Sequence, residues 1–228
     1  MKKFIMWAIA LFVGGVTLPS TEALSADLTS CPALGKVDFS MLLDAPTHVT
    51  ASRVVEGSDD MPAYCQVTGY VSPAVEFEMW MPVKNWNGKF LYRGCGGYCG
   101  FVGVASCANH VKDGYACIAS DMGHTSTALD AKWAYNAIQA EIDFGYRGTH
   151  VVTVAGKAIA ESFYDDAPNR SYYMGCSTGG RQGLVEAQRF PYDFDGIVAG
   201  APVINETGAG MQLNWNVASN RDENGNQI

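Results

Sequence analysis

Residues 171–190 read SYYMGCSTGGRQGLVEAQRF, and the order of patterns in this segment indicates the fold of the chain. Residues 171–174 form a short apolar run that is typical of a strand buried on both faces. Residues 181–190 have the pattern of a helix. Between them, residues 175–179 match the motif G-x-S-x-G, in which a serine sits at a sharp turn between strand and helix. The stretch therefore predicts a serine nucleophile at the edge of a sheet.

The spacing of this motif has a physical reason. A serine in so sharp a turn has a strained backbone, so Gly175 and Gly179 must lack side chains that would clash. The turn exposes the hydroxyl of Ser177 and places the amide of Thr178 at the helix N-terminus, where it can donate to a developing oxyanion. A plain glycine-rich turn is the alternative, and the strand before and helix after argue against it.

A second oxyanion donor is expected from the loop after the preceding sheet strand. Residues 93–98 read RGCGGY and follow directly on the apolar run at residues 90–92. Glycines in this loop would let a backbone N–H approach the substrate oxygen closely. The interpretation depends on Ser177, because a Gly-Gly loop alone predicts only a turn.

Strand-like and helix-like segments alternate through the rest of the chain. Residues 66–71 and 76–81 alternate polar and apolar side chains and predict an antiparallel edge. Residues 142–164 repeat apolar side chains at three- and four-residue steps, as a crossover helix does. Continuous apolar runs predict strands buried on both faces at residues 90–92, 115–119, 172–174 and 196–199. We therefore predict an α/β fold with a mostly parallel sheet and helices on both faces.

Composition and the N-terminus indicate an exported globular protein. The chain has 228 residues, 48% of them hydrophobic and 17% charged, as a single packed domain does. A basic start and an apolar run at residues 4–13 predict a signal peptide over residues 1–26. Residues 27–228 would then be secreted or periplasmic. A retained membrane anchor is the alternative, but the apolar run is too short to span a bilayer.

The net charge of the chain argues against two classes of binding partner. The formal net charge is −8, which argues against nucleic acid or an anionic membrane as partner. We expect no membrane association after signal removal.

The histidines are in the wrong place for a complete catalytic triad. All four precede Ser177, whereas this architecture has serine, then acid, then histidine along the chain. The catalytic Asp and His are therefore predicted to be absent from this chain. His124 is the best of the four, and we interpret it as a substrate-side or structural residue. Asp121 is expected to cap or brace the loop that carries it rather than to titrate.

The seven cysteines should be mostly oxidised in an exported protein. Their odd number means that one is free or has its partner outside this sequence. A zinc site at Cys95 and Cys99 is a weaker alternative, because His110 and Cys107 do not follow ordinary ligand spacing. Three connectivities are open to Cys95, Cys99, Cys107 and Cys117.

The chain resembles the tannase and feruloyl esterase family of α/β-hydrolases, which also includes the hydrolase of mono(2-hydroxyethyl) terephthalate. Residues 175–183, 188–191 and 192–202 carry the resemblance, together with residues 86–90 and 121–124. It extends over about residues 31–220 and implies that residues 27–228 are the N-terminal part of the catalytic domain, ending before a lid and the last strands.

The resemblance implies roles for particular residues. Thr178 and Gly97 would supply the oxyanion amides. No cofactor is expected for catalysis and no metal in this chain, although family members often carry a structural calcium in the lid. Asp222-Glu223-Asn224-Gly225-Asn226 superficially suggests a calcium loop, but it lacks the other ligands and is interpreted as a turn.

The family resemblance also implies particular disulfide bonds. Cys31 would pair with Cys65, and Cys176 with a cysteine beyond residue 228 that directly follows the catalytic histidine. For the other four cysteines we favour a bond between Cys99 and Cys107.

The sequence thus predicts a secreted serine carboxylic ester hydrolase that forms an acyl-enzyme with small aromatic acid esters, such as galloyl or feruloyl esters. Residues 27–228 alone should have little turnover, because a serine without a base is a poor nucleophile. One alternative is an inactive fragment or binding module on a hydrolase scaffold. Another is a lipase or peptidase of the same fold, which G-x-S-x-G alone does not exclude.

Overall fold

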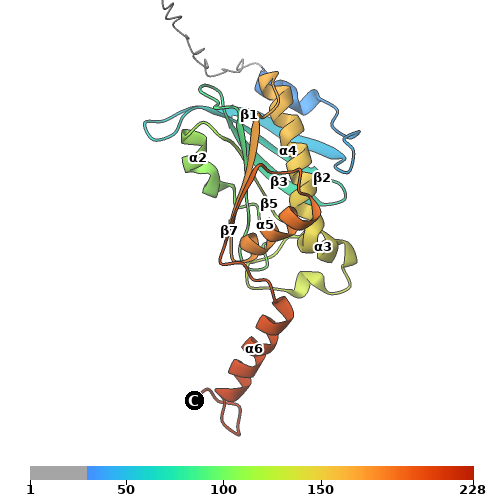
Figure 1. Ribbon diagram of the computed structural model, residues 1–228, viewed down its shortest axis with the longest axis vertical. Coiled ribbons are helices and arrows are strands. Elements are labelled where there is room, and N and C mark those ends of the chain that lie inside the picture. The colour runs from blue at the N-terminus through green and yellow to red at the C-terminus, as the bar shows by residue number, and fades with distance from the viewer. Residues whose placement is uncertain (1–29) are drawn as a thin grey trace, which may run out of the picture.

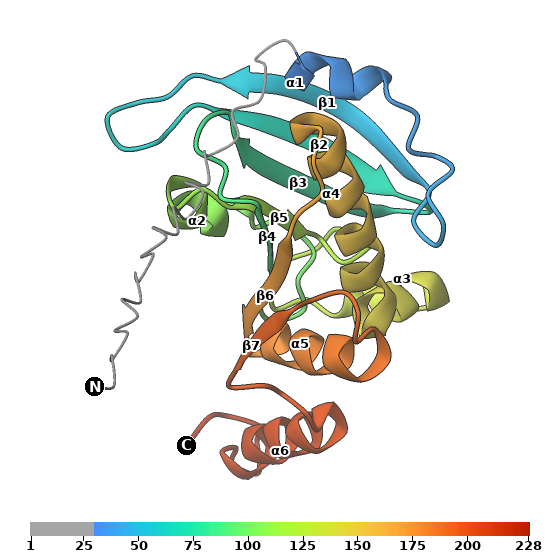
Figure 2. The same ribbon diagram turned by 45° about the horizontal axis from the view of Figure 1, so that its top comes forward.

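The computed structural model describes residues 30–228, so the signal peptide predicted for residues 1–26 lies outside the described residues. A 7-stranded sheet with the order β1-β2-β3-β5-β4-β6-β7 runs through the molecule (Figures 1 and 2). Its strands are β1 (Thr47–Val55), β2 (Tyr64–Val71), β3 (Val75–Pro82), β4 (Lys89–Arg93), β5 (Ala116–Ser120), β6 (Arg170–Cys176) and β7 (Gly196–Gly200).

Helical segments connect these strands. In chain order they are α1 (Ser30–Ala33), η1 (Leu34–Lys36), η2 (Val104–Cys107), α2 (Ala108–Lys112), η3 (Lys132–Ala134), α3 (Ile138–Ile142), η4 (Asp143–Arg147), α4 (Gly148–Tyr164), α5 (Thr178–Arg189) and α6 (Glu206–Ser219). Among residues 30–228, no helix combines the length and the apolar character needed to cross a bilayer.

The sheet is mixed. β1 pairs with β2, β2 with β3 and β3 with β5 in antiparallel fashion. β4 pairs in parallel with both β5 and β6, and β6 with β7. The predicted α/β class and antiparallel edge are confirmed, but the antiparallel part is larger than a mostly parallel sheet would have. Strand β1 accounts for the difference, since its sequence lacks the clean alternation that marks β2 and β3.

The crossover helix predicted over residues 142–164 is observed, with an interruption. Segments α3, η4 and α4 follow one another directly, and η4 is a π-helical turn. On α4, Val151, Ala155 and Ile159 are fully buried or nearly so and belong to the main apolar core. The three- and four-residue spacing thus reflects a helix face packed on the sheet.

Helices cover both faces of the sheet, as predicted. Helices α4 and α5 lie on one face and the short α2 on the other (Figures 1 and 2). A second apolar cluster, which includes Leu91, Val111 and Cys117, fills the space under α2. Helix α6 extends away from the body (Figure 1), and its Met211, Leu213 and Trp215 are exposed.

The disulfides correct one prediction. Cys31 is bonded to Cys65 as expected, whereas the predicted bond between Cys99 and Cys107 is wrong. Cys95 is bonded to Cys99, and Cys107 to Cys117. The cause is the packing of η2 and α2 against β5. This packing brings the Cα atom of Cys107 within 5.7 Å of that of Cys117, while Cys99 faces Cys95 across a tight loop.

Because Cys95 and Cys99 are joined to each other, they do not form the alternative zinc site. Cys176 is exposed and unpaired among residues 30–228. Its predicted bond to a cysteine beyond residue 228 stays a prediction.

Candidate active site

The sharp turn predicted at Ser177 is observed between β6 and α5. Ser177 has φ 59° and ψ −118°, a backbone conformation that costs a residue with a side chain about 1 to 3 kcal/mol. Its N–H donates to the carbonyl oxygen of Gly200 at the end of β7 (3.0 Å). The neighbouring strand therefore holds the strained turn in place.

Close approach of backbone segments explains the two flanking glycines. A Cβ atom on Gly175 would lie 2.5 Å from the carbonyl oxygen of Gly179. A Cβ atom on Gly179 would lie 2.8 Å from the carbonyl oxygen of Cys95. Neither distance leaves room for a methyl group, so both positions require glycine, as the sequence predicted.

The glycine loop lies directly beside this turn. Strands β4 and β6 are parallel neighbours, with Arg93 opposite Met174, so the segments that follow them emerge together. Gly94 N–H donates to the carbonyl oxygen of Met174 (3.0 Å). The structure therefore brings together the two segments that were predicted to form the oxyanion site.

Gly97 has a conformation that only glycine adopts easily here. Its φ is 58°, and a Cβ atom would lie 2.2 Å from the carbonyl oxygen of Ala128. The Thr178 hydroxyl donates to the Gly97 carbonyl oxygen at 2.7 Å. The loop is thus fixed from both sides, by residues 126–128 and by the start of α5.

Electrostatics at the start of α5 favour an anion. Thr178 is the first residue of α5, where backbone N–H groups have no acceptor within the helix and the helix dipole is positive. Ser177 is half-buried, and Cys176 and Gly97 on either side of it are exposed. The half-buried Ser177 therefore lies at the positive end of α5, next to the loop that contains Gly97.

Arg181, one turn into α5, was not singled out from the sequence. Its guanidinium donates to the carbonyl oxygens of Gly145 (3.0 Å) and Phe144 (3.1 Å) and lies over the Phe144 ring. It also lies 3.5 Å from a carboxylate oxygen of Glu206. Arg181 thereby ties α5 to the π-helical turn η4. The sequence offered one signal for this role, a basic residue four positions after the serine. It did not show which residues Arg181 contacts, because these lie far away in the sequence.

His124 lies beside the glycine loop, and its ring is occupied by structural contacts. Its Nε2 atom is 2.7 Å from the carbonyl oxygen of Tyr98, and the ring stacks on Trp133 with 3.7 Å between centroids. Burial lowers the pKa of His124. These contacts fit the prediction of a structural or substrate-side residue.

The other histidines lie on β1, α2 and α4. His48 stacks on Tyr70 and His110 packs against Tyr115, while His150 contacts Asp193. Within residues 30–228, no histidine forms a hydrogen bond with Ser177. That the catalytic base lies outside this chain stays a prediction.

Asp121 braces its loop, as predicted. One carboxylate oxygen accepts the N–H groups of Glu76 (2.9 Å) and Gly123 (2.8 Å). Burial, assisted by the nearby Glu76 carboxylate and opposed by these two hydrogen bonds, raises the pKa of Asp121 to about 7. The expectation that Asp121 would brace the loop without titrating is therefore only half right, because a buried carboxyl is easier to protonate.

The segment at residues 222–226 is a turn, as predicted. The Asp222 carboxylate accepts the N–H groups of Asn224 (2.9 Å) and Asn226 (2.8 Å). It is thus engaged by its own backbone.

Comparison with known proteins agrees with this geometry. The sequence model of the family described as tannase and feruloyl esterase matches residues 54–228. An uncharacterized esterase of Xanthomonas campestris pv. campestris is 35% identical over 204 residues, covering 88% of this chain and 35% of its own. A probable feruloyl esterase B-1 of Aspergillus fumigatus is 42% identical over 146 residues, covering 62% of this chain and 27% of its own.

Solved structures of two esterases are similar to this chain. Feruloyl esterase B from Aspergillus oryzae has a TM-score of 0.75 at 30% identity, over 86% of this chain and 41% of that one. Tannin acyl hydrolase from Aspergillus niger has a TM-score of 0.60 at 26% identity, over 79% of this chain and 38% of that one. The fold is therefore the α/β-hydrolase fold. The chain spans between 27% and 35% of the length of these curated relatives.

Proposed function

The chain belongs to the tannase and feruloyl esterase family, and from this membership we propose that it is the nucleophile-bearing part of a secreted serine carboxylic ester hydrolase. Its substrates are esters of aromatic acids, with galloyl and feruloyl esters the first candidates. One observation carries the proposal: Ser177 occupies a strained turn with φ 59° beside a glycine loop that is hydrogen-bonded to the next residue, Thr178.

The reaction begins with attack by the Ser177 hydroxyl oxygen on the ester carbonyl carbon. The carbonyl electron pair moves to oxygen, where the amides of Thr178 and Gly97 stabilise the negative charge. The serine proton passes to the histidine predicted beyond residue 228. When the tetrahedral intermediate collapses, the alcohol leaves with a proton and the acyl group stays on Ser177. Water then attacks the acyl-enzyme and releases the acid.

The glycine loop and α5 contribute by preorganisation. Donors that are fixed before the reaction cost no reorganisation when charge develops, and removing one such donor lowers kcat by about 100- to 1,000-fold. Here the loop is fixed by its bonds to Met174 and Thr178 and by the conformation of Gly97. The substrate oxygen would meet donors already in position.

Export is supported by the oxidised cysteines. Three disulfides are formed within residues 30–228, and such bonds persist in oxidising compartments. Together with the predicted signal peptide they favour a secreted or periplasmic enzyme.

The proposal is tested with the intact gene product and its Ser177→Ala variant, assayed on methyl ferulate, methyl gallate and casein. We expect hydrolysis of one or both aromatic esters, no cleavage of casein, and a loss of about four to six orders of magnitude in kcat in the variant. Ser58→Ala, at an exposed turn residue, should leave the rate unchanged. Full activity in Ser177→Ala would refute the mechanism, and cleavage of casein alone would favour a peptidase.

A further inference from the structure

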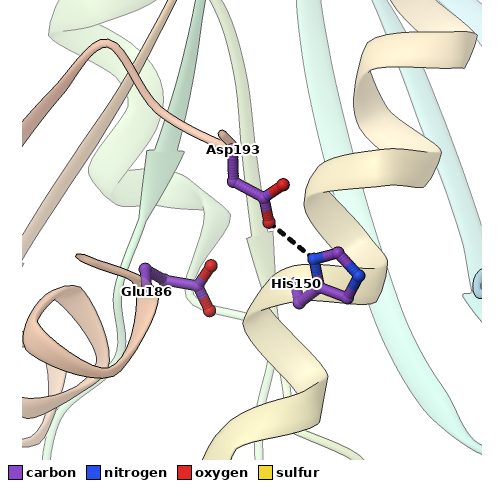
Figure 3. A group of neighbouring side chains, drawn as sticks. All are labelled: His150, Glu186 and Asp193. Atoms are coloured by element: carbon purple, nitrogen blue, oxygen red, sulfur yellow. Dashed lines mark hydrogen bonds and ion pairs between the residues drawn. The ribbon is translucent and has the colours of Figure 1, made fainter. Parts of the chain in front are cut away.

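A cluster of three titratable side chains lies away from Ser177, between α4, α5 and the loop before β7. It consists of His150 on α4, Glu186 on α5 and Asp193 in the loop (Figure 3). His150 Nδ1 lies 2.6 Å from a carboxylate oxygen of Asp193, and one ligand atom from each residue lies within 4.8 Å of the others.

Glu186 is the unusual member of the cluster. It is 0% exposed, and among residues 30–228 neither of its carboxylate oxygens has a hydrogen-bond partner. Burying an ionised carboxylate without a partner is costly, so such a group takes up either a proton or a cation. Burial, together with the negative charge of the neighbouring Asp193, holds the pKa of Glu186 well above its ordinary value.

The surroundings hold the cluster in shape. The Phe190 ring stacks on the His150 imidazole with 3.9 Å between centroids. The Lys157 ammonium donates to the backbone carbonyl oxygen of Asp193 and thereby fixes the loop. Its positive charge also faces the two carboxylates and offsets part of their attraction for a cation, while burial lowers the pKa of Lys157.

We propose that His150, Glu186 and Asp193 bind a divalent transition-metal ion, with Zn²⁺ the best-matched ion. One imidazole nitrogen and two carboxylate oxygens are ordinary zinc ligands, and a water molecule would complete a tetrahedral set. Calcium instead takes six to eight oxygen ligands, and magnesium requires a near-ideal octahedron of oxygens. Binding would replace the His150–Asp193 hydrogen bond, because both of its atoms become ligands and the ring hydrogen must leave Nδ1. It would also release the Glu186 proton and give the Glu186 carboxylate oxygens a partner.

The ion would act as a structural brace. Along α5, about two and a half turns or roughly 13 Å separate Glu186 from Ser177, so the ion would not contact the substrate. It would join α4, α5 and the segment that leads into β7. The segment from β6 through α5 to β7 carries the proposed nucleophile, which gives this region a reason to be rigid.

The experiment measures the melting temperature of the 228-residue chain with the substitution Cys176→Ser. This substitution removes the exposed thiol, which would otherwise bind zinc by itself. After treatment with a chelator, Zn²⁺ at about a hundred times its Kd should raise the melting temperature by roughly 5 to 10 °C, and Mg²⁺ should have no effect. An unchanged melting temperature with Zn²⁺ would overturn the proposal and indicate that Glu186 simply holds a proton.

Substitution of the proposed ligands tests where the ion binds. Glu186→Gln and His150→Gln should each abolish the zinc-dependent shift, while His48→Gln, at an exposed histidine on β1, should retain it. A shift that persists in Glu186→Gln would overturn the proposal.

If the two cluster variants fail to fold, Co²⁺ binding to the Cys176→Ser parent decides the question. The intense visible absorption of tetrahedral Co²⁺, displaced by Zn²⁺, is expected. No absorption, or only the weak spectrum of an octahedral ion, would contradict the site.

Discussion

The Thr178 hydroxyl donates a hydrogen bond of 2.7 Å to the carbonyl oxygen of Gly97, across 81 residues of sequence. Thr178 begins α5, and Gly97 lies in the loop after β4. The bond is possible because β4 and β6 are parallel neighbours in the sheet. A single contact thus joins the two segments that carry the proposed oxyanion donors.

Replacing Thr178 with valine should weaken this junction. Valine has nearly the same shape but leaves the Gly97 carbonyl oxygen without its donor, which should lower the free energy of unfolding by about 1 to 3 kcal/mol. In the intact gene product we also expect a lower kcat with little change in KM, since the loop would be held less rigidly. Urea unfolding and steady-state kinetics measure these effects. Thr178→Ser should retain both properties, and an unchanged Thr178→Val would show that the bond is unimportant.

A methyl group at Gly179 should be poorly tolerated. Its Cβ atom would lie 2.8 Å from the Cys95 carbonyl oxygen, so Gly179→Ala should lower the free energy of unfolding by about 1 to 3 kcal/mol. Gly96→Ala, in the loop that contains Cys95, is the matched control, because no atom of residues 30–228 lies within 4 Å of its Cβ position. Equal unfolding free energies for the two variants would contradict the close packing described above.

The strain at Ser177 should be measurable. Glycine adopts the observed φ without penalty, so Ser177→Gly should have a free energy of unfolding about 1 kcal/mol above that of Ser177→Ala, after allowing for the greater entropy of unfolded glycine. Both variants lack the hydroxyl, so the comparison isolates the backbone. If Ser177→Gly is the less stable of the two, the turn is not strained.

Local determinants explain what was predictable from the sequence. The turn at Ser177 depends on a strand, two glycines and a helix that are contiguous in the chain, and each is visible as a pattern. The adjacent glycine loop was predictable because the order of parallel strands places successive loops at one edge. In these places, the residues that determine the structure are close in sequence.

Features that depend on tertiary packing were missed. Sequence spacing alone does not show whether Cys107 meets Cys99 or Cys117, because the path of residues 99–117 decides it. His150, Glu186 and Asp193 come from three separate elements, so no short motif marks them. The one available signal was the position of Glu186 on α5. It lies one turn after the buried Gln182 and Gly183, and therefore on the same buried face of the helix.

Asp121 should make stability depend on pH. Its pKa is raised from 3.8 to about 7 in the folded protein, so between these values the folded state holds more protons than the unfolded chain. The contribution of Asp121 to stability is therefore complete below pH 4 and is lost as the pH rises toward 7, by about 1.4 kcal/mol per pH unit. Asp121→Asn should flatten the curve over this window. An equal slope in both proteins, measured by urea unfolding from pH 4 to 8, would contradict the burial of an ionisable Asp121.

Covalent labelling identifies which residue is the nucleophile. The intact gene product is treated with an aryl phosphonate ester, which modifies activated serines, and the site is identified by peptide mass spectrometry. One phosphonyl group on Ser177, formed in proportion to the loss of ester hydrolysis, is the predicted result. A label on another residue with Ser177 unmodified, or undiminished hydrolysis by the fully labelled protein, would contradict the assignment of Ser177 as the nucleophile.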